Sequence, residues 1–347
     1  MPPLVSILIP AYNAEPWIAD AIQSALRQTW PRKEIIVVDD GSRDQTLREA
    51  RQFASNTVSV ITQPNQGAAA ARNKALSLSQ GAYIQWLDAD DLLAPDKTEK
   101  QMLAAERVQN KRTLLSSGWA PFAFRAYKAR FIPTALWQNL SPVEWKIRQM
   151  QYSLHMQTAT WLTSRELTEA AGPWNTELLG DDDGEYFCRV MLASDGIHFV
   201  PDAKVYYRTT DASRLSHIGG SDRKKDAQFA SMRLHIASVR SLEDSERVRA
   251  ACLQYLQSWL INFYPERPDI VRQAEQLALE LGGSLSAPWL SWKYRWVKKL
   301  FGWNAAKYTQ FYYSQLKTSC WRALDKALFR LERKANLRDG KNGGGHA

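Results

Sequence analysis

The first hundred residues alternate between short apolar runs and amphipathic segments, and this pattern restricts the fold more than any other feature of the chain. Short apolar runs predict four strands, at 5–10, 34–38, 58–62 and 83–87. The segments between them have helical spacing, at 15–27, 44–53 and 67–79. Strands that are apolar throughout and alternate with helices are typical of a parallel sheet covered on both faces. We therefore predict an α/β fold with a mostly parallel central sheet.

The remaining chain divides by pattern and charge. Residues 111–208 read as an extension of the same sheet, with strands expected at 122–131 and 158–163 among others. From 222 to 281 the pattern is helical. We predict four parts, an α/β domain, a helical extension, a basic Trp-rich helical tail and a disordered end, at 1–218, 219–285, 286–340 and 341–347.

The formal charge of +9 comes from residues 286–347, where thirteen Lys and Arg face three acidic residues. Five tryptophans are interleaved with these cations. Such a composition suits a membrane surface, although nucleic acid or a solvated helix face are alternatives. We expect residues 286–340 to meet a membrane surface and do not expect a nucleic-acid partner.

The three cysteines, Cys188, Cys252 and Cys320, are far apart, and no run approaches the roughly 20 apolar residues of a membrane-spanning helix. The amino-terminal apolar stretch is too short for a signal peptide. We expect a cytoplasmic protein, peripheral at the inner face of the membrane.

Acidic residues follow two of the predicted strands. Asp39 and Asp40 come after the second strand, and Asp88, Asp90 and Asp91 come after the fourth. Ligands of such sheets bind at the carboxyl ends of the strands. Carboxylates two residues apart in an extended turn point the same way and suit Mg²⁺ or Mn²⁺. The alternatives are a helix cap at Asp90 or Asp91 and an ordinary Asp-Gly turn after Asp40.

Four linked motifs resemble the family 2 glycosyltransferases. They are Ser-Ile-Leu-Ile-Pro-Ala-Tyr-Asn at 6–13, Ile-Val-Val-Asp-Asp-Gly-Ser at 36–42, Asn-Gln-Gly at 65–67 with Ala-Arg-Asn at 71–73, and Leu-Asp-Ala-Asp-Asp at 87–91. The resemblance is strong from residue 4 to about 100, fainter to about 218, and absent beyond. It implies a GT-A nucleotide-binding sandwich, followed here by an α-helical C-terminal region.

The resemblance also implies roles for single residues. The nucleotide pocket would be lined by Pro10, Ala11, Tyr12 and Asn13. Asp40 would accept from the base with Asp39 beside it, and Asp88 would bond the ribose. Asp90 would ligate the metal, and His217 is an additional candidate for the metal or the pyrophosphate. Arg72 would meet the nucleotide, or would be an ordinary residue on a helix surface.

A second acidic cluster, Asp181 to Asp183, precedes a predicted helix at 185–193. By resemblance Asp183, six residues before Arg189, is the catalytic base. Asp182 stands where the family usually has Glu, and Gly184 where it often has an aromatic residue. Asp181 and Asp182 remain rival bases, Asp182 is also an acceptor-site candidate, and helix capping alone would explain three acids here. Trp174 either stacks on an acceptor sugar or belongs to the core.

The resemblance thus predicts an inverting, metal-dependent glycosyltransferase with Mg²⁺ or Mn²⁺ as cofactor. It would move a single sugar from a nucleotide diphosphate sugar, with UDP expected, to a hydroxyl of a glycan or lipid-linked glycan in cell-surface polysaccharide synthesis. The Gln-X-X-Arg-Trp signature of processive synthases is absent. The alternatives are a nucleotidyltransferase that makes an activated sugar, and a non-enzymatic binder of membrane or nucleic acid.

Overall fold

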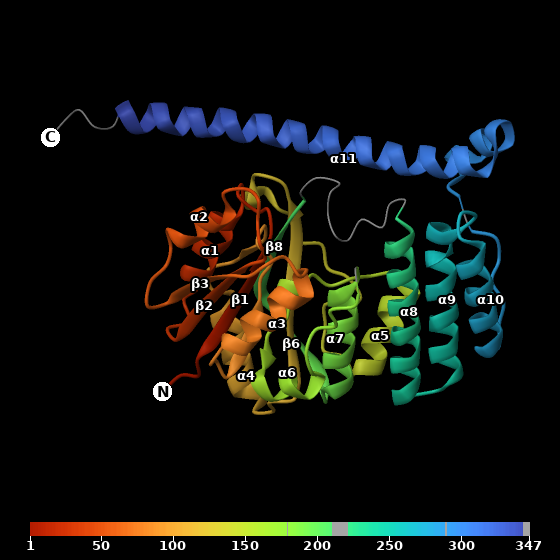
Figure 1. Ribbon diagram of the computed structural model, residues 1–347, viewed down its shortest axis with the longest axis horizontal. Helices are drawn as coiled ribbons and strands as arrows, with labels where there is room; N and C mark the ends of the chain where they lie inside the picture. The colour runs from red at the N-terminus through yellow and green to blue at the C-terminus, as the bar shows by residue number, and fades with distance from the viewer. Residues whose placement is uncertain (179, 210–220, 289, 343–347) are drawn as a thin grey trace. The chain divides into compact units, whose positions relative to one another are not determined.

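The computed structural model describes residues 1–178, 180–209, 221–288 and 290–342, and side chains up to residue 332 of the last helix (Figure 1). The chain forms two compact units. The first contains Met1–Ala120, Phe131–Tyr207 and Leu215–Pro288. The second contains Pro121–Arg130, Arg208–Arg214 and Trp289–Ala347. A short segment from the middle of the sequence thus belongs to the same unit as the tail.

The first unit contains a five-stranded sheet in the order β3-β2-β1-β4-β7. Its strands are β1 (Val5–Ala11), β2 (Lys33–Asp39), β3 (Val58–Thr62), β4 (Tyr83–Trp86) and β7 (Thr163–Ser164). The first four are parallel and β7 runs antiparallel to β4. Ala11 lies beside Asp39, and Asp39 beside Thr62, so the carboxyl ends of β1 to β3 share one edge. The predicted α/β class with a mostly parallel sheet is confirmed.

Each face of this sheet has its own apolar core. Val5, Ile7 and Ile9 of β1 pack on one face with α1 (Ile18–Leu26), and α2 (Thr46–Arg51) contributes to the same core. Leu8, from the opposite face of β1, packs with α3 (Ala68–Leu78). Side chains alternate along a strand, so a strand buried on both faces is apolar throughout. This explains why β1 is apolar apart from Ser6, and why the middle of β2, residues 35–38, is entirely apolar.

A smaller sheet joins β5 (Leu92–Leu93), β8 (Gly196–Arg208) and β6 (Thr113–Phe122) in the order β5-β8-β6. The helices of this part are α4 (Lys97–Val108), α5 (Pro142–Tyr152), α6 (Arg165–Ala171) and α7 (Asp182–Ala193).

Two of the expected strands are wrong. Residues 122–131 contain the 3₁₀ turn η1 (Ala126–Lys128), and residues 158–163 contain η2 (Thr158–Thr160) with only the start of β7. In η2 the Gln157 side chain accepts from the backbone N–H of Ala159, and this local bond replaces strand pairing.

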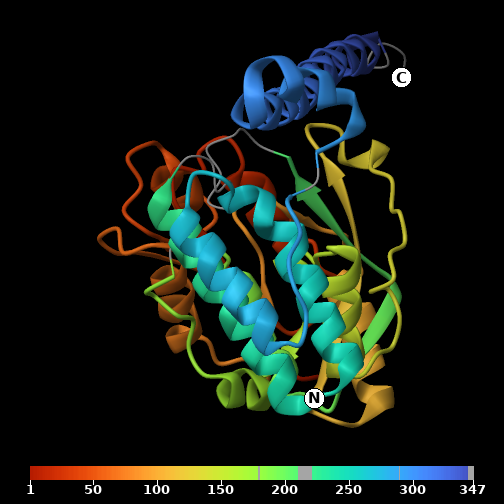
Figure 2. The same ribbon diagram turned by 90° about the vertical axis from the view of Figure 1, so that its right-hand side faces the viewer.

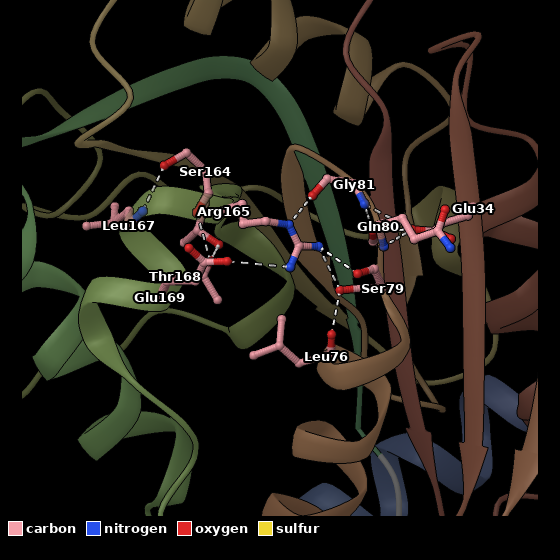
Figure 3. A network of polar contacts seen from close by, with 12 residues as sticks. Glu34, Leu76, Ser79, Gln80, Gly81, Ser164, Arg165, Leu167, Thr168 and Glu169 are labelled. Atoms are coloured by element: carbon pink, nitrogen blue, oxygen red, sulfur yellow. Dashed lines mark hydrogen bonds and ion pairs between the residues drawn. The ribbon is translucent and has the colours of Figure 1, made fainter.

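The amino-terminal edge of the main sheet is fastened by Arg165 at the start of α6 (Figure 3). Its Nε donates to the carbonyl of Gly81 at 2.8 Å, and its Nη2 donates to the carbonyl and hydroxyl of Ser79 at 3.0 and 2.9 Å. The hydroxyl of Ser164 accepts from the backbone of Leu167 and caps the same helix. These contacts lie at the opposite end of β4 from the acidic motif, and they are structural.

Three further helices belong to the first unit: α8 (Asp222–Leu242), α9 (Glu246–Phe263) and α10 (Pro268–Glu280). They lie side by side in both views (Figures 1 and 2). Their shared core includes Phe229, Met232, Leu256 and Ile270, and it reaches Ile147 of α5. The helices therefore pack on α5 and α7 rather than forming a separate unit.

The second unit is organised by the long helix α11 (Arg295–Asn342), preceded by the 3₁₀ turn η3 (Trp292–Tyr294). Its helical backbone is interrupted at Gly302, where φ is 81°. Asp325 accepts from the backbone of Phe124 at 2.9 Å and from Nε of Arg125 at 2.7 Å. Across the part of the chain that the structure covers, no helix has both the length and the apolar character needed to span a bilayer.

Candidate active site at the carboxyl ends of the strands

Asp39 is the last residue of β2 and Asp40 follows it, but their carboxylates have different surroundings. Asp40 accepts from Gln63 Nε2 at 2.7 Å and from the backbone N–H groups of Gln66 and Gly67 at 3.0 and 2.8 Å. Asp39 accepts from Thr62 through Oδ2 at 3.0 Å, whereas its buried Oδ1 has no hydrogen-bond partner among the described residues. A buried carboxylate oxygen without a donor costs free energy that a ligand N–H would offset. The structure thus favours Asp39 over Asp40 as the acceptor for a ligand.

The loops after β1 and β2 are tied together. Asn13 adopts a left-handed backbone conformation with φ of 48°. Its N–H donates to Ser42 Oγ at 3.0 Å, and its Oδ1 accepts from the backbone of Arg43 at 2.9 Å. Gly41 is required nearby because φ is 71° and a Cβ would lie 2.8 Å from the backbone nitrogen of Asn65. Pro10 and Ala11 belong to β1 itself, while the side chain of Tyr12 is exposed beside these loops.

Arg72 lies at the centre of the acidic residues rather than on a helix surface. Its Nη1 is 2.6 Å from Asp182 Oδ2, and its Nη2 is 2.9 Å from Asp88 Oδ1. The residue is only 6% exposed. Burial alone would lower the pKa of Arg72, but the charges of Asp182 and Asp88 outweigh burial and raise it. Arg72 therefore joins the motif after β4 to the acidic turn before α7, and both of its terminal nitrogens have protein partners.

The Arg72 guanidinium packs on the ring of Trp174, which belongs to a cluster of aromatic side chains. Trp174 lies 4.4 Å from the Arg72 guanidinium carbon and stacks on Tyr186 with ring centroids 4.0 Å apart. Trp86 meets Trp174 edge-on at 5.1 Å. Trp174 is 1% exposed, so of the two interpretations of this residue the structure supports the core. A sugar cannot stack on a ring whose faces are occupied by Tyr186 and Arg72.

The acidic turn 181–183 contains two carboxyl groups with raised pKa values. Burial, followed by the charge of Asp182, raises the pKa of Asp183 to about 6. Burial, followed by the charge of Asp183, raises the pKa of Asp181 to about 7. Asp183 Oδ2 accepts from Thr158 Oγ1 at 3.2 Å, whereas Asp182 is occupied by Arg72. Asp181 and Asp183 thus both have pKa values raised toward neutral pH, as a general base requires, while Asp182 is held by Arg72.

Two site residues were missed in the sequence. Gln157 donates to Asp91 and, at 3.4 Å, to Asp88 Oδ2, and Thr158 donates to Asp183. Both are almost fully buried. Thr158 begins the segment 158–163 that we expected to be a strand, and Gln157 directly precedes it. Polar residues at the start of a strand are common, so nothing in the sequence singles them out. Only their burial beside the carboxylates distinguishes them.

The predicted metal ligands are placed only in part. Asp90 is partly buried in the turn between Asp88 and Asp91, while His217 lies outside the described residues. Within the described ranges no three His, Cys, Asp or Glu side chains are grouped to hold a metal ion. Mg²⁺ in nucleotide enzymes is commonly held by one or two carboxylates with substrate phosphates and water completing the shell. The carboxylates after β4 are oxygen donors of the kind that such a cation takes, and Asp90 as its ligand stays a prediction.

Comparison with known proteins agrees with the motifs. Residues 6–123 match the family model described as glycosyl transferase family 2. TuaG of Bacillus subtilis, whose name places it among glycosyltransferases of teichuronic acid biosynthesis, is 45% identical over 103 residues, covering 29% of this chain and 41% of TuaG. Chondroitin synthase of Escherichia coli is 46% identical over 99 residues, 28% of this chain and 14% of that enzyme. The chain thus spans less than half the length of these relatives.

Solved structures extend the likeness beyond the matched segment. The crystal structure of residues 1–349 of S. aureus TarS in complex with UDP-GlcNAc superposes with a TM-score of 0.65 at 17% identity. The superposition covers 80% of this chain and 81% of that one. At this identity the likeness shows the fold alone, which is the GT-A type predicted from the motifs.

Proposed function

We propose that this chain, whose residues 6–123 match the model of glycosyl transferase family 2, transfers one sugar from a nucleotide diphosphate sugar to a hydroxyl group, with inversion at the anomeric carbon. The acceptor is a glycan or lipid-linked glycan of cell-surface polysaccharide synthesis. The names of TuaG and chondroitin synthase support a polysaccharide product, and the TarS complexes with UDP and UDP-GlcNAc support UDP as the nucleotide.

One observation carries the proposal: acids from two distant motifs meet around Arg72. Asp88 and Asp182 are 94 residues apart in sequence by their numbers, yet each is within 2.9 Å of the same guanidinium. Asp183 lies next to Asp182, and its pKa is lowered by the charge of Arg72 and raised by that of Asp88. A donor that binds after β2 and β4 would therefore present its anomeric carbon near the acidic turn.

In the proposed reaction the acceptor oxygen bonds to the anomeric carbon while the bond from that carbon to the diphosphate oxygen breaks. Asp183 takes the proton of the acceptor hydroxyl as the oxygen attacks. Asp39 accepts from the nucleotide base and Asp88 from the ribose. Mg²⁺ or Mn²⁺ held by Asp90 would stabilise the negative charge on the leaving diphosphate. Arg72 keeps Asp88 and Asp182 in place.

We expect Asp183→Asn to lower sugar transfer by about 10²- to 10⁴-fold because it removes the base while keeping the shape of the side chain. The measurement is transfer from a panel of UDP-sugars to glycan acceptors with Mn²⁺ present, together with UDP affinity. Asp202→Asn, an exposed acid on β8, is the matched control and keeps full activity. Full transfer by Asp183→Asn contradicts the assigned role.

The runner-up is a nucleotidyltransferase, which would release pyrophosphate from a nucleoside triphosphate and a sugar phosphate. The end of β1 and the loop after it argue against this reading, because Pro10 to Asn13 contains none of the glycines and cations expected to cradle a triphosphate. Pyrophosphate release in the same panel, without UDP release, would reverse the choice.

A further inference from the structure

A row of polar side chains on α8 lies buried behind the acidic turn. Gln228, Ser231 and His235 are 5%, 0% and 2% exposed, and their spacing of three and four places them on one face of the helix. The rest of that face is apolar, with Phe229, Met232 and Ile236 packed into the helical core. Buried polar groups are retained only where they have partners.

Two side chains of this row bond to Asp181 at the start of the acidic turn. Ser231 Oγ donates to Asp181 Oδ2 at 2.5 Å, and Gln228 Nε2 donates to the same oxygen at 3.3 Å. His235 Nε2 lies 3.5 Å from Ser231 Oγ, and its Nδ1 lies 3.2 Å from the hydroxyl of Tyr255 on α9. Asp182 and Asp183 directly follow the residue that α8 holds.

The backbone of the turn needs such support. Asp181 adopts a left-handed conformation with φ of 55°, which costs a non-glycine residue about 1 kcal/mol or more. Although it precedes the first residue of α7, its carboxylate caps no N–H of that helix. The carboxylate instead lies over Gly184, where a Cβ would be 2.2 Å from Asp181 Oδ1. The absence of a side chain at Gly184 therefore leaves space for the carboxylate of Asp181, which Ser231 and Gln228 of α8 bind by hydrogen bonds.

We propose that Ser231 of α8, which His235 contacts from the same helix, is a positioning residue for sugar transfer: by holding Asp181 it keeps the carboxylates of Asp182 and Asp183 directed toward Arg72 and Thr158. This inference rests on the proposed role of Asp183 as base. It gives the helical region, which lies outside the matched family segment, a part in the reaction.

The electrostatics agree with a geometric role for His235. Burial, followed by the positive charge of Lys146 on α5, holds the pKa of His235 well below its usual range. The ring is therefore neutral and serves as a hydrogen-bonding partner. Asp181 receives its two donors from neutral side chains, so its contacts with α8 are hydrogen bonds without an ion pair.

The test is steady-state kinetics of the full chain with Ser231→Ala, which removes one oxygen atom from the cluster. We expect kcat to fall about 10- to 100-fold, because a base displaced by even one ångström loses its alignment. The KM for the donor stays within roughly twofold, because Ser231 touches no part of the proposed donor site. Ser231→Thr keeps a hydroxyl and restores most of kcat. Ser241→Ala, at the exposed end of the same helix, is the matched control.

A coupling measurement separates positioning from simple stability. In an Asp183→Asn background Ser231→Ala causes no further loss, because the group that it positions is already absent. A variant that lowers the melting temperature but leaves kcat unchanged overturns the inference and leaves the proposed function intact. Full activity of Asp183→Asn overturns the proposed function itself. If Ser231→Ala does not fold, Gln228→Met, which removes one donor to Asp181 at similar length, provides the same comparison with a smaller expected fall.

Discussion

At the scale of single residues, the site depends on how burial divides similar acids into different roles. Asp40 is engaged by three protein donors, and Asp182 by Arg72. Asp39 retains a buried oxygen without a donor among the described residues, and Asp183 has a raised pKa. Acids that are identical in the sequence thus separate into structural and reactive groups through their neighbours.

The pH dependence of transfer follows from Asp183. An aspartate in water titrates near 3.8, but here the pKa is raised to about 6 by burial and by Asp182. The base acts only when deprotonated, so kcat/KM rises with pH through about 6 and is about tenfold below its plateau at pH 5. The measurement is a pH–rate profile of the wild type, with Asp202→Asn as the control that keeps the same limb. A profile that stays flat down to pH 5 contradicts the assignment of Asp183 as the base.

At the scale of elements, the start of α7 is the most constrained part of the site. Its preceding residue is left-handed, its third residue must be glycine, and its acids contact α3, η2 and α8. The family resemblance marked Gly184 as a departure, and the carboxylate of Asp181 explains it. The space that a larger side chain would fill is taken by an acid tied to α8.

We expect Gly184→Ala to lower the free energy of unfolding by about 1–3 kcal/mol, because the new Cβ overlaps a carboxylate that Ser231 and Gln228 prevent from moving freely. Urea unfolding measures the change. Gly180→Ala is the matched control, since a Cβ at residue 180 meets no atom within 4 Å. Equal stability of Gly184→Ala and the wild type would show that the turn relaxes at no cost.

At the scale of the whole molecule, α11 of the second unit has two different faces. Asp325, Phe329 and Glu332 contact Phe124 and Arg125 within that unit. Another face exposes Tyr313, Leu316, Cys320, Leu324 and Leu331, again at spacings of three and four. An exposed apolar face among many Lys and Arg residues fits an anionic bilayer surface. We propose that this face gives the chain its membrane contact, in keeping with a lipid-linked acceptor.

Replacing Leu316 and Leu324 together by Ser should therefore reduce binding to vesicles that contain phosphatidylglycerol by at least about tenfold, because each buried leucine contributes about 1.5–3 kcal/mol. Co-sedimentation of the full chain measures the binding. Leu279→Ser, an equally exposed leucine on α10, is the control. Unchanged binding of the double variant contradicts a membrane role for this face, and binding to oligonucleotides but not vesicles would favour nucleic acid.

The sequence by itself determined the alternation of strands and helices, the order of the four motifs and the positions of the acids after β2 and β4. These are local properties, since periodicity and turn chemistry act over a few residues. Only the tertiary structure decided that Arg72 is buried between Asp88 and Asp182, that Trp174 is core, and that Gln157, Thr158 and Ser231 meet the acids. Those contacts join residues far apart along the chain, and such pairings leave no periodic signal, because they arise only when separate elements pack around a shared core.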